Sequence, residues 1–160
     1  KCWWQFGTLT LNFNMSIFKP FKPERYKEEN VEVDFFKHEE KSIMLVRLKG
    51  ALPEGSKARL DCNYIKQQLA INLLAMRPVS LLLDMSLLKY SFGNSLIDAF
   101  SPLFELQIFE DKFDIAFLLS DLNKYGLASL WGFDINQPPR NIFFRYKEAL
   151  QYVVAEYDSI

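Results

Sequence analysis

The residue types that most often catalyse reactions are sparse in this sequence. Its single histidine, His38, lies in the charged stretch Lys37–Lys41, which we expect to be a solvent-exposed turn. Cys62 falls within an apolar helical pattern far along the chain from that histidine, so we expect a small buried residue rather than a nucleophile. Because the single imidazole lies in that turn, away from the strand-end loops where α/β folds build their sites, most catalytic triads and most imidazole metal sites are disfavoured.

The acidic residues form no recognisable catalytic or metal-binding motif. The candidates among the nine aspartates are scattered along the chain, at positions Asp84, Asp98, Asp114, Asp121 and Asp134. No spacing among them indicates a shared general acid and base or a cation site. Asp84 follows a buried strand, where we expect its carboxylate to hydrogen-bond the next turn. We therefore predict a non-enzymatic protein with no catalytic residue, no metal ligand and no cofactor.

The glycine-rich motifs that cradle phosphate groups are also missing. Neither GxGxxG nor GxxxxGK[ST] occurs among the six glycines. Phe92-Gly93-Asn94-Ser95 leads into a predicted helix, whose free N–H groups could hold an anion. An ordinary Asn or Ser cap explains the same residues equally well.

Hydrophobic periodicity predicts the elements that must position these side chains. From Val31, apolar residues alternate with charged ones, a charged turn follows at residues 37–41, and a second apolar run ends at Gly50. This pattern indicates a β-hairpin. Val79–Asp84 and Phe113–Leu119 are continuous apolar runs, typical of strands that are buried on both faces. Asn141–Phe144 is predicted as a last, short strand.

Four further stretches show helical periodicity. They are residues 56–75 with Ser56 as N-cap, 95–106, 121–131 capped by Ser120 and Asp121, and 146–157. Pro102 lies inside the second stretch, so we expect a kink or a break there. In the first, the side chains expected to face the sheet are Leu60, Tyr64, Ile65, Leu69, Leu73 and Met76. The order of elements predicts an α/β domain in which helices pack against one mixed central sheet.

The first thirty residues differ in character from the rest. Residues 1–14 are rich in aromatic side chains, and Thr8–Phe13 alternates polar and apolar residues as a half-buried edge strand does. Residues 16–30 carry two prolines and mixed charge, as irregular connectors do. We expect an N-terminal β extension and connector over residues 1–30 and the α/β domain over residues 31–160.

Four pieces of sequence, taken in order, are distinctive. The hairpin ends in Leu48-Lys49-Gly50, and Leu82–Tyr90 reads LLDMSLLKY. Ala116–Ser120 is followed by a predicted helix, and Phe143–Leu150 reads FFRYKEAL. Over about residues 31–157 they resemble the STAS domain of bacterial anti-sigma-factor antagonists and anion-transporter tails, which has similar LDLS-x-L-x-Y/F and F-x-x-x-x-E-A-L stretches. This resemblance implies a STAS-like fold and a protein-binding role in a bacterial regulatory or signalling system.

The resemblance fails at one loop. After the tyrosine, STAS antagonists carry Asp-Ser-Ser-Gly, whose first serine is phosphorylated by a partner kinase. This chain has Phe92-Gly93-Asn94-Ser95 there, without a hydroxyl at the acceptor position, although Ser91 and Ser95 leave a displaced phosphorylation open. The resemblance implies a partner-binding surface, with Phe92 as its exposed anchor, made of Tyr90, Ser91, Phe92, Gly93, Asn94 and Ser95.

Composition narrows the class of partner. The net charge is −1 and basic residues are not interleaved with aromatic ones, so we expect no nucleic-acid partner. No apolar run reaches the roughly 18 residues needed to span a bilayer. Two cysteines make no disulfide framework. We therefore expect a cytoplasmic protein without membrane insertion, whose partner is another protein; a homodimer is also open.

Two other functions stay open on the sequence. A small non-enzymatic α/β domain also suits an immunity or antitoxin protein that occludes a toxin's active site, and a neighbouring toxin gene would favour that function. A small-molecule or lipid-binding domain could instead use a pocket beneath the aromatic-rich N-terminal segment.

Overall fold

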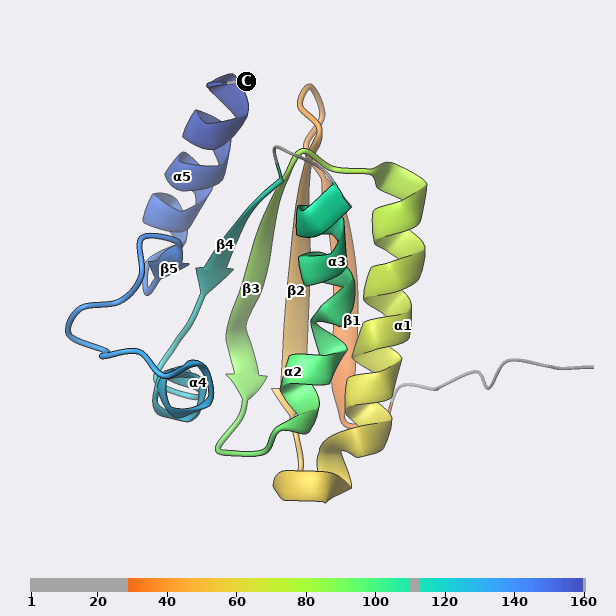
Figure 1. Cartoon of the computed structure of the whole chain (residues 1–160), viewed down its shortest axis with the longest axis vertical. Coiled ribbons are helices and arrows are strands. Elements are labelled where there is room, and N and C mark those ends of the chain that lie inside the picture. Colours follow the sequence, from red (N-terminus) through yellow and green to blue (C-terminus); the bar gives the residue numbers. More distant parts are fainter. Residues whose placement is uncertain (1–28, 110–112, 160) are drawn as a thin grey trace, which may run out of the picture.

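The computed structural model describes residues 29–109 and 113–159, with 107–109 described by their backbone alone. They form a five-stranded sheet with helices on both faces (Figure 1). In chain order the elements are β1 (Val31–Lys37), β2 (Ile43–Ala51), the 3-10 helix η2 (Gly55–Ala58), α1 (Arg59–Met76), β3 (Ser80–Lys89), α2 (Ser95–Ala99), α3 (Ser101–Phe109), β4 (Asp114–Leu118), α4 (Lys124–Trp131), β5 (Ile142–Phe143) and α5 (Tyr146–Asp158). The predicted α/β fold is confirmed, whereas the predicted N-terminal strand lies outside the described residues.

The sheet is mixed, as expected, in the spatial order β1-β2-β3-β4-β5. β1 and β2 form an antiparallel hairpin, and β2 to β5 are parallel to one another. β3 lies in the middle, with Leu81 and Leu83 buried on one face and Leu82 on the other. Burial on both faces explains why its sequence is a continuous apolar run.

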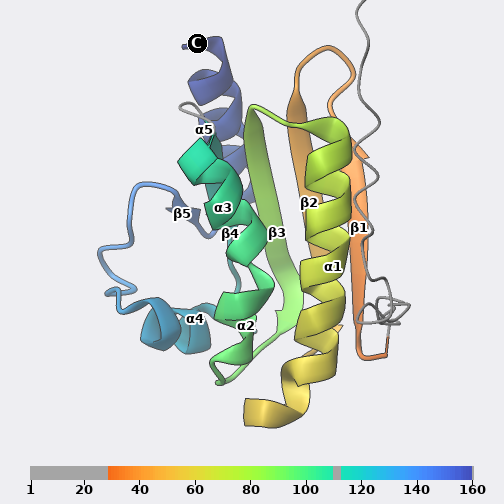
Figure 2. The same ribbon diagram turned by 45° about the vertical axis from the view of Figure 1, so that its right-hand side comes forward.

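Helices cover the two faces unequally. α1, α2 and α3 lie over one face and α5 over the other (Figures 1 and 2). The larger core joins Ile65 and Leu69 of α1 to the sheet, and the smaller core joins Ala149 and Val153 of α5 to it. None of the described helices is long and apolar enough to cross a membrane.

Two helices begin later than predicted. η2 precedes α1, which therefore begins at Arg59, and neither helix has a side-chain cap from Ser56. α4 begins at Lys124 because Ser120 first forms a turn, in which its hydroxyl accepts the Leu122 N–H at 3.2 Å and its carbonyl accepts the Lys124 N–H at 2.9 Å. The predicted caps at Ser56 and at Ser120 and Asp121 are thus wrong.

Two other boundaries show how partners set the length of an element. β3 runs to Lys89 rather than ending at Asp84, because its last residues pair with β2 after a register shift between Arg47 and Lys49. The break expected at Pro102 is confirmed, since the chain forms α2 and α3 as separate helices on either side of Phe100. These two features place a short helix directly after the loop that leaves β3.

One predicted face of α1 is partly wrong. Ile65, Leu69 and Leu73 are buried as expected, but Leu60 is 49% exposed. At 3.6 residues per turn, Leu60 points about 140° away from Ile65, so it cannot share the buried face. Ile71 and Leu74, exposed by 58% and 72%, lie on the same outer side of the helix as Leu60.

Candidate functional site

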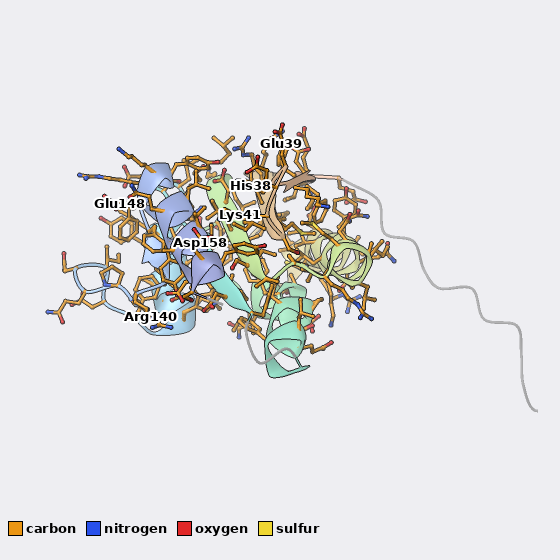
Figure 3. All side chains as sticks on the ribbon, turned by 90° about the horizontal axis from the view of Figure 1, so that it is seen from above. His38, Glu39, Lys41, Arg140, Glu148 and Asp158 are labelled. Carbon is orange, nitrogen blue, oxygen red and sulfur yellow. The ribbon has the colours of Figure 1, made fainter. Side chains whose placement is uncertain are left out.

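His38 lies at the tip of the β1–β2 hairpin, as predicted, and shapes that turn. Its Nδ1 accepts the N–H groups of Glu40 at 3.2 Å and Lys41 at 3.3 Å. Figure 3 shows it beside Glu39 and Lys41, and Lys41 forms an ion pair with Asp158 at the end of α5. The hairpin tip is at the end of the sheet opposite to the carboxyl end of β3 (Figure 1). The imidazole therefore organises a turn far from the predicted binding loop.

Cys62 is a buried thiol on α1, as predicted. Burial, with smaller contributions from the negative charges of Asp61 and Asp98, raises the pKa of Cys62 to about 12. Since the thiolate is the nucleophilic form, this cysteine is inert near neutral pH.

The five aspartates considered in the sequence analysis do not converge on one site. Asp84 is buried within β3, where its carboxylate accepts the Arg47 Nε–H at 2.8 Å and the Ser86 N–H at 3.0 Å. A structural hydrogen bond is thus present as expected, but its partners lie on β2 and β3 and not in a following turn. Asp98 and Asp121 form surface ion pairs with lysines, at 2.8 Å and 2.5 Å. Among residues 29–109 and 113–159 no three histidine, cysteine or acidic side chains gather as a metal site would require.

Asp61 is a buried carboxylate that the sequence did not single out. It is 2% exposed on α1, and its two oxygens accept the backbone N–H and the side-chain amide of Asn30, each at 3.0 Å. These bonds fix the start of β1 against α1. Both oxygens are thus used in holding two elements together.

The loop after β3 is supported from below by Tyr90. This residue is buried, its hydroxyl donates to the Gly93 carbonyl at 2.6 Å, and its N–H donates to the Leu122 carbonyl at 3.1 Å. Burial raises the pKa of Tyr90, with a smaller contribution from the negative charge that Cys62 can carry nearby. The phenol therefore stays protonated and can donate a hydrogen bond. Tyr90 is therefore a support for the loop, and little of its side chain reaches the surface.

Glycine contacts hold the loop on both sides. On one side, the Gly55 N–H donates to the Phe92 carbonyl at 3.2 Å, and a Cβ on Gly93 would lie 3.2 Å from Gly55 Cα. On the other side, a Cβ on Gly126 of α4 would lie only 2.4 Å from the Ser91 carbonyl oxygen. Gly93 also has a φ of +136°, which L side chains rarely adopt. The loop is thus packed backbone against backbone between η2 and α4.

Sequence reasoning missed Gly55 and Gly126 as parts of this site. Gly126 carried a signal, because a glycine inside a helical pattern costs stability and commonly marks a close backbone approach. Which backbone it approaches was not readable, since Ser91 lies on a different element.

Three of the predicted site residues present side chains to solvent. Phe92 is 56% exposed, and Ser91 and Asn94 are also exposed, while Ser95 is half-buried as the first residue of α2. A pocket of about 530 Å³ lies between this loop, η2 and α4, lined by Gly55, Ser56, Tyr90, Phe92, Gly93, Asn94, Ser95, Gly126, Ser129 and Leu130. Its lining contains hydroxyl and amide groups and no carboxylate, imidazole or ammonium.

Further apolar side chains are exposed on the two helices that follow the loop. Ile97 on α2 is 43% exposed and Phe104 on α3 is 39% exposed, and both line a groove that also includes Asn94. Asp98 and Glu105 line the same groove and give it a polar rim. We call Phe92, Asn94, Ile97 and Phe104 the loop–α2 surface.

No protein-family model matches this sequence, and no curated protein matches it at a significant level. A search of solved structures finds similarity to an anti-sigma factor antagonist from Mycobacterium paratuberculosis, with a TM-score of 0.55 and 14% sequence identity. The alignment covers 78% of this chain and 94% of that one. The fold implied by the sequence resemblance is confirmed by this similarity: the chain has a STAS-like, anti-sigma-factor-antagonist fold.

Proposed function

We propose that the chain is a non-catalytic protein-binding module of a bacterial regulatory or signalling system, and that its partner docks on the loop–α2 surface. The observation that carries this proposal is the combination of an exposed aromatic residue, Phe92, with a loop backbone packed against Gly55 and Gly126. A side chain on a fixed loop loses little conformational freedom on binding, which favours affinity.

The chemistry of the surface supports a protein partner. Its exposed apolar side chains are Phe92, Ile97 and Phe104, and the polar residues Asp98 and Glu105 line the groove that contains Ile97 and Phe104. Protein interfaces commonly combine aromatic anchors at the centre with a polar rim. The similar solved structure is named an anti-sigma factor antagonist, so a regulatory protein is the partner class we expect.

The sequence and backbone of this loop favour a module that binds its partner without being switched by phosphorylation. Gly93 stands where the STAS antagonists have their phospho-acceptor serine, and it has no hydroxyl. A serine there would have to adopt a φ near +136° and would bring its Cβ within 3.2 Å of Gly55 Cα. The local backbone therefore disfavours any side chain at this position, and partner binding is expected without kinase control at Gly93.

Affinity capture followed by a binding measurement tests the proposal. A tagged chain is used to capture and identify partners in the source cells, and the purified partner is then titrated against the double variant Phe92→Ala, Asn94→Ala. We expect at least about a tenfold loss of affinity, as for a central aromatic anchor. The matched control is Leu74→Ala, which removes a more exposed apolar side chain from α1.

Unchanged affinity in the double variant, or an equal loss in the α1 control, would place the partner elsewhere. Identification of the partner as a toxin would support the immunity or antitoxin function in place of the regulatory one.

The pocket beside the loop supports a second candidate, a small-molecule binder. Its volume of about 530 Å³ is within the range of ligand sites, and Ser56, Asn94 and Ser129 line it with hydrogen-bonding groups. A thermal-shift screen separates this function from the first, because a ligand raises the melting temperature only if it binds the folded state. A hit that a Ser129→Phe variant abolishes would favour the small-molecule function.

A further inference from the structure

Side chains of α2 and α3 form two parallel rows on the surface. The two helices are separate, but the backbone keeps winding between them, since the Phe100 N–H donates to the Ile97 carbonyl at 3.2 Å and the Phe104 N–H donates to the Phe100 carbonyl at 3.4 Å. Ile97 and Phe104 are seven residues apart, about two helical turns, so they project on the same side. Asp98 and Glu105 have the same spacing and line the same groove. An apolar row therefore runs beside an acidic row.

The acidic row is on the side of α1. Asp98 forms an ion pair with Lys66 of α1 at 2.8 Å, and Glu105 lines a smaller groove together with Leu73 and Leu74 of α1. Figure 2 shows α2 and α3 beside α1 on this face of the sheet. Both partners of the Asp98–Lys66 pair are exposed, so the pair contributes little to stability and can be exchanged. Glu105 forms no ion pair with any residue in the ranges 29–109 and 113–159.

The groove has an excess of negative charge. Of the described residues that line it, Asp98 and Glu105 are acidic and none is basic. The net charge of the chain is only −1, so the excess is local. A partner that covered the apolar row would have to neutralise Glu105, because burying a charge without a partner is costly. Lysine or arginine next to the apolar residues of the partner would meet this requirement.

The spacing of the two rows favours a helix as the docking segment. Seven residues of a helix span about 10.5 Å, at about 1.5 Å per residue. A partner helix repeats its side chains at the same interval, so its apolar and basic residues can match both rows. Residues on one side of a β-strand are about 6.8 Å apart, an interval that does not match. An amphipathic helix lying in an apolar groove is also a recurring mode of recognition.

We propose that the partner segment that docks on the loop–α2 surface is a basic amphipathic helix. Its apolar stripe covers Ile97 and Phe104, and lysine or arginine side chains along one side of the stripe pair with Asp98 and Glu105. This inference rests on the proposed function and adds the chemistry of the partner to it.

Overlapping synthetic peptides of 20 residues, covering the sequence of the captured partner, test the proposal. Each is titrated against the full-length chain, with binding followed by fluorescence anisotropy and helicity by circular dichroism. We expect the peptides that bind to carry apolar residues at helical spacing flanked by lysine or arginine, and to gain helicity on binding. Glu105→Lys should weaken their affinity by about tenfold at low salt and Glu105→Gln by about threefold, and both losses should shrink in 0.5 M salt.

The matched control is Glu39→Lys. It makes the same change of charge at an exposed position in the hairpin turn, at the opposite end of the sheet from the loop, and should leave the affinity within about twofold. An equal loss in this control would overturn the proposal, because the effect would then come from the net charge of the chain.

Other outcomes separate this proposal from the proposed function. If the double variant Phe92→Ala, Asn94→Ala loses affinity and Glu105→Lys does not, the basic helix is wrong and the docking surface stands. If neither changes the affinity, both fail. Binding peptides that are acidic or gain no helicity would overturn the basic helix, as would an intact partner that binds when none of its peptides does. A dimer in sedimentation that Glu105→Lys dissociates would overturn it in favour of a second copy of this chain.

Discussion

At the carboxyl end of β3, the loop is held by contacts between backbones, whereas the hairpin turn at the opposite end of the sheet is held by an imidazole and surface charges. The loop end presents the exposed Phe92, and the hairpin end presents Lys41 and Asp158. Backbone packing leaves no room for adjustment, while exposed ion pairs are screened and mobile. The difference indicates that the loop end is built to hold a fixed apolar shape and the hairpin end is not.

The largest effect should come from filling the contact between α4 and the loop. Gly126→Ala places a Cβ 2.4 Å from the Ser91 carbonyl oxygen, so we expect the free energy of unfolding to fall by about 3 kcal/mol. A glycine-to-alanine change inside a helix ordinarily stabilises by up to 1 kcal/mol, so even the sign is informative. Urea unfolding of the variant measures it.

Gly132→Ala is the control for that comparison. Gly132 has a φ of +71° and no atom within 4 Å of the added Cβ, so only the left-handed backbone should cost stability, about 1 kcal/mol. Equal losses in the two variants would show that the loop can move away from α4, and the idea of a fixed loop would fail.

The next largest effect is a dependence on alkaline pH at the loop end, where Cys62 lies near Tyr90. Because burial raises the pKa of Cys62 from 9.0 to about 12, the folded protein keeps a proton that the unfolded chain releases above pH 9. The stabilisation is complete below pH 9 and is lost as pH rises toward 12. Between pH 9 and pH 10.5 the free energy of unfolding should fall by about 2 kcal/mol more in the parent than in Cys62→Ala.

Urea titrations at a series of pH values compare the two slopes, so any constant loss from the alanine cavity cancels. If the free energy of unfolding fell equally with pH in parent and variant, burial of the Cys62 thiol would not be the cause of the loss at alkaline pH.

A smaller effect is expected from the support beneath the loop. Tyr90→Phe removes the hydroxyl that donates to the Gly93 carbonyl, which should lower the free energy of unfolding by about 1 kcal/mol. Tyr125→Phe changes a tyrosine that is 67% exposed and should cost less than 0.5 kcal/mol. Thermal unfolding of both variants separates them, and a neutral Tyr90→Phe would remove this hydrogen bond from the account.

The smallest effect should be at the hairpin end. Lys41→Ala breaks the ion pair with Asp158, whose side chain is 55% exposed, so we expect a loss of less than 0.5 kcal/mol that disappears in 0.5 M salt. A loss above about 1.5 kcal/mol, or one that persists in salt, would show that the two ends are not as different as the contacts indicate.

The parts of the fold that periodicity could predict are those set by local pattern. The buried run at Leu81–Leu83 and the break before Pro102 both follow from neighbours along the chain. The extension of β3 to Lys89 depends on pairing with β2 after a register shift, and the face of α1 was misassigned at Leu60. These depend on tertiary partners and on helical phase, which a short apolar pattern fixes only loosely.

The site shows the same division. Phe92 could be located because the resemblance placed it in the loop after β3, and the structure places it on the surface. Gly55 and Gly126 could not be located from the sequence, because each contributes through a contact with a segment distant in the chain. Tyr90 was predicted for the surface, but its hydroxyl is used inside the loop. The position of the loop follows from the sequence, whereas the contacts that hold it join segments far apart in the chain.

Site-specific photo-crosslinking in the source cells tests most directly whether the partner docks at the loop end. A benzophenone amino acid is placed at position 92 in one variant and at position 39, in the hairpin turn, in another; both side chains are exposed. We expect a covalent adduct with a partner protein from position 92 and none from position 39. An adduct from position 39, with none from position 92, would contradict it.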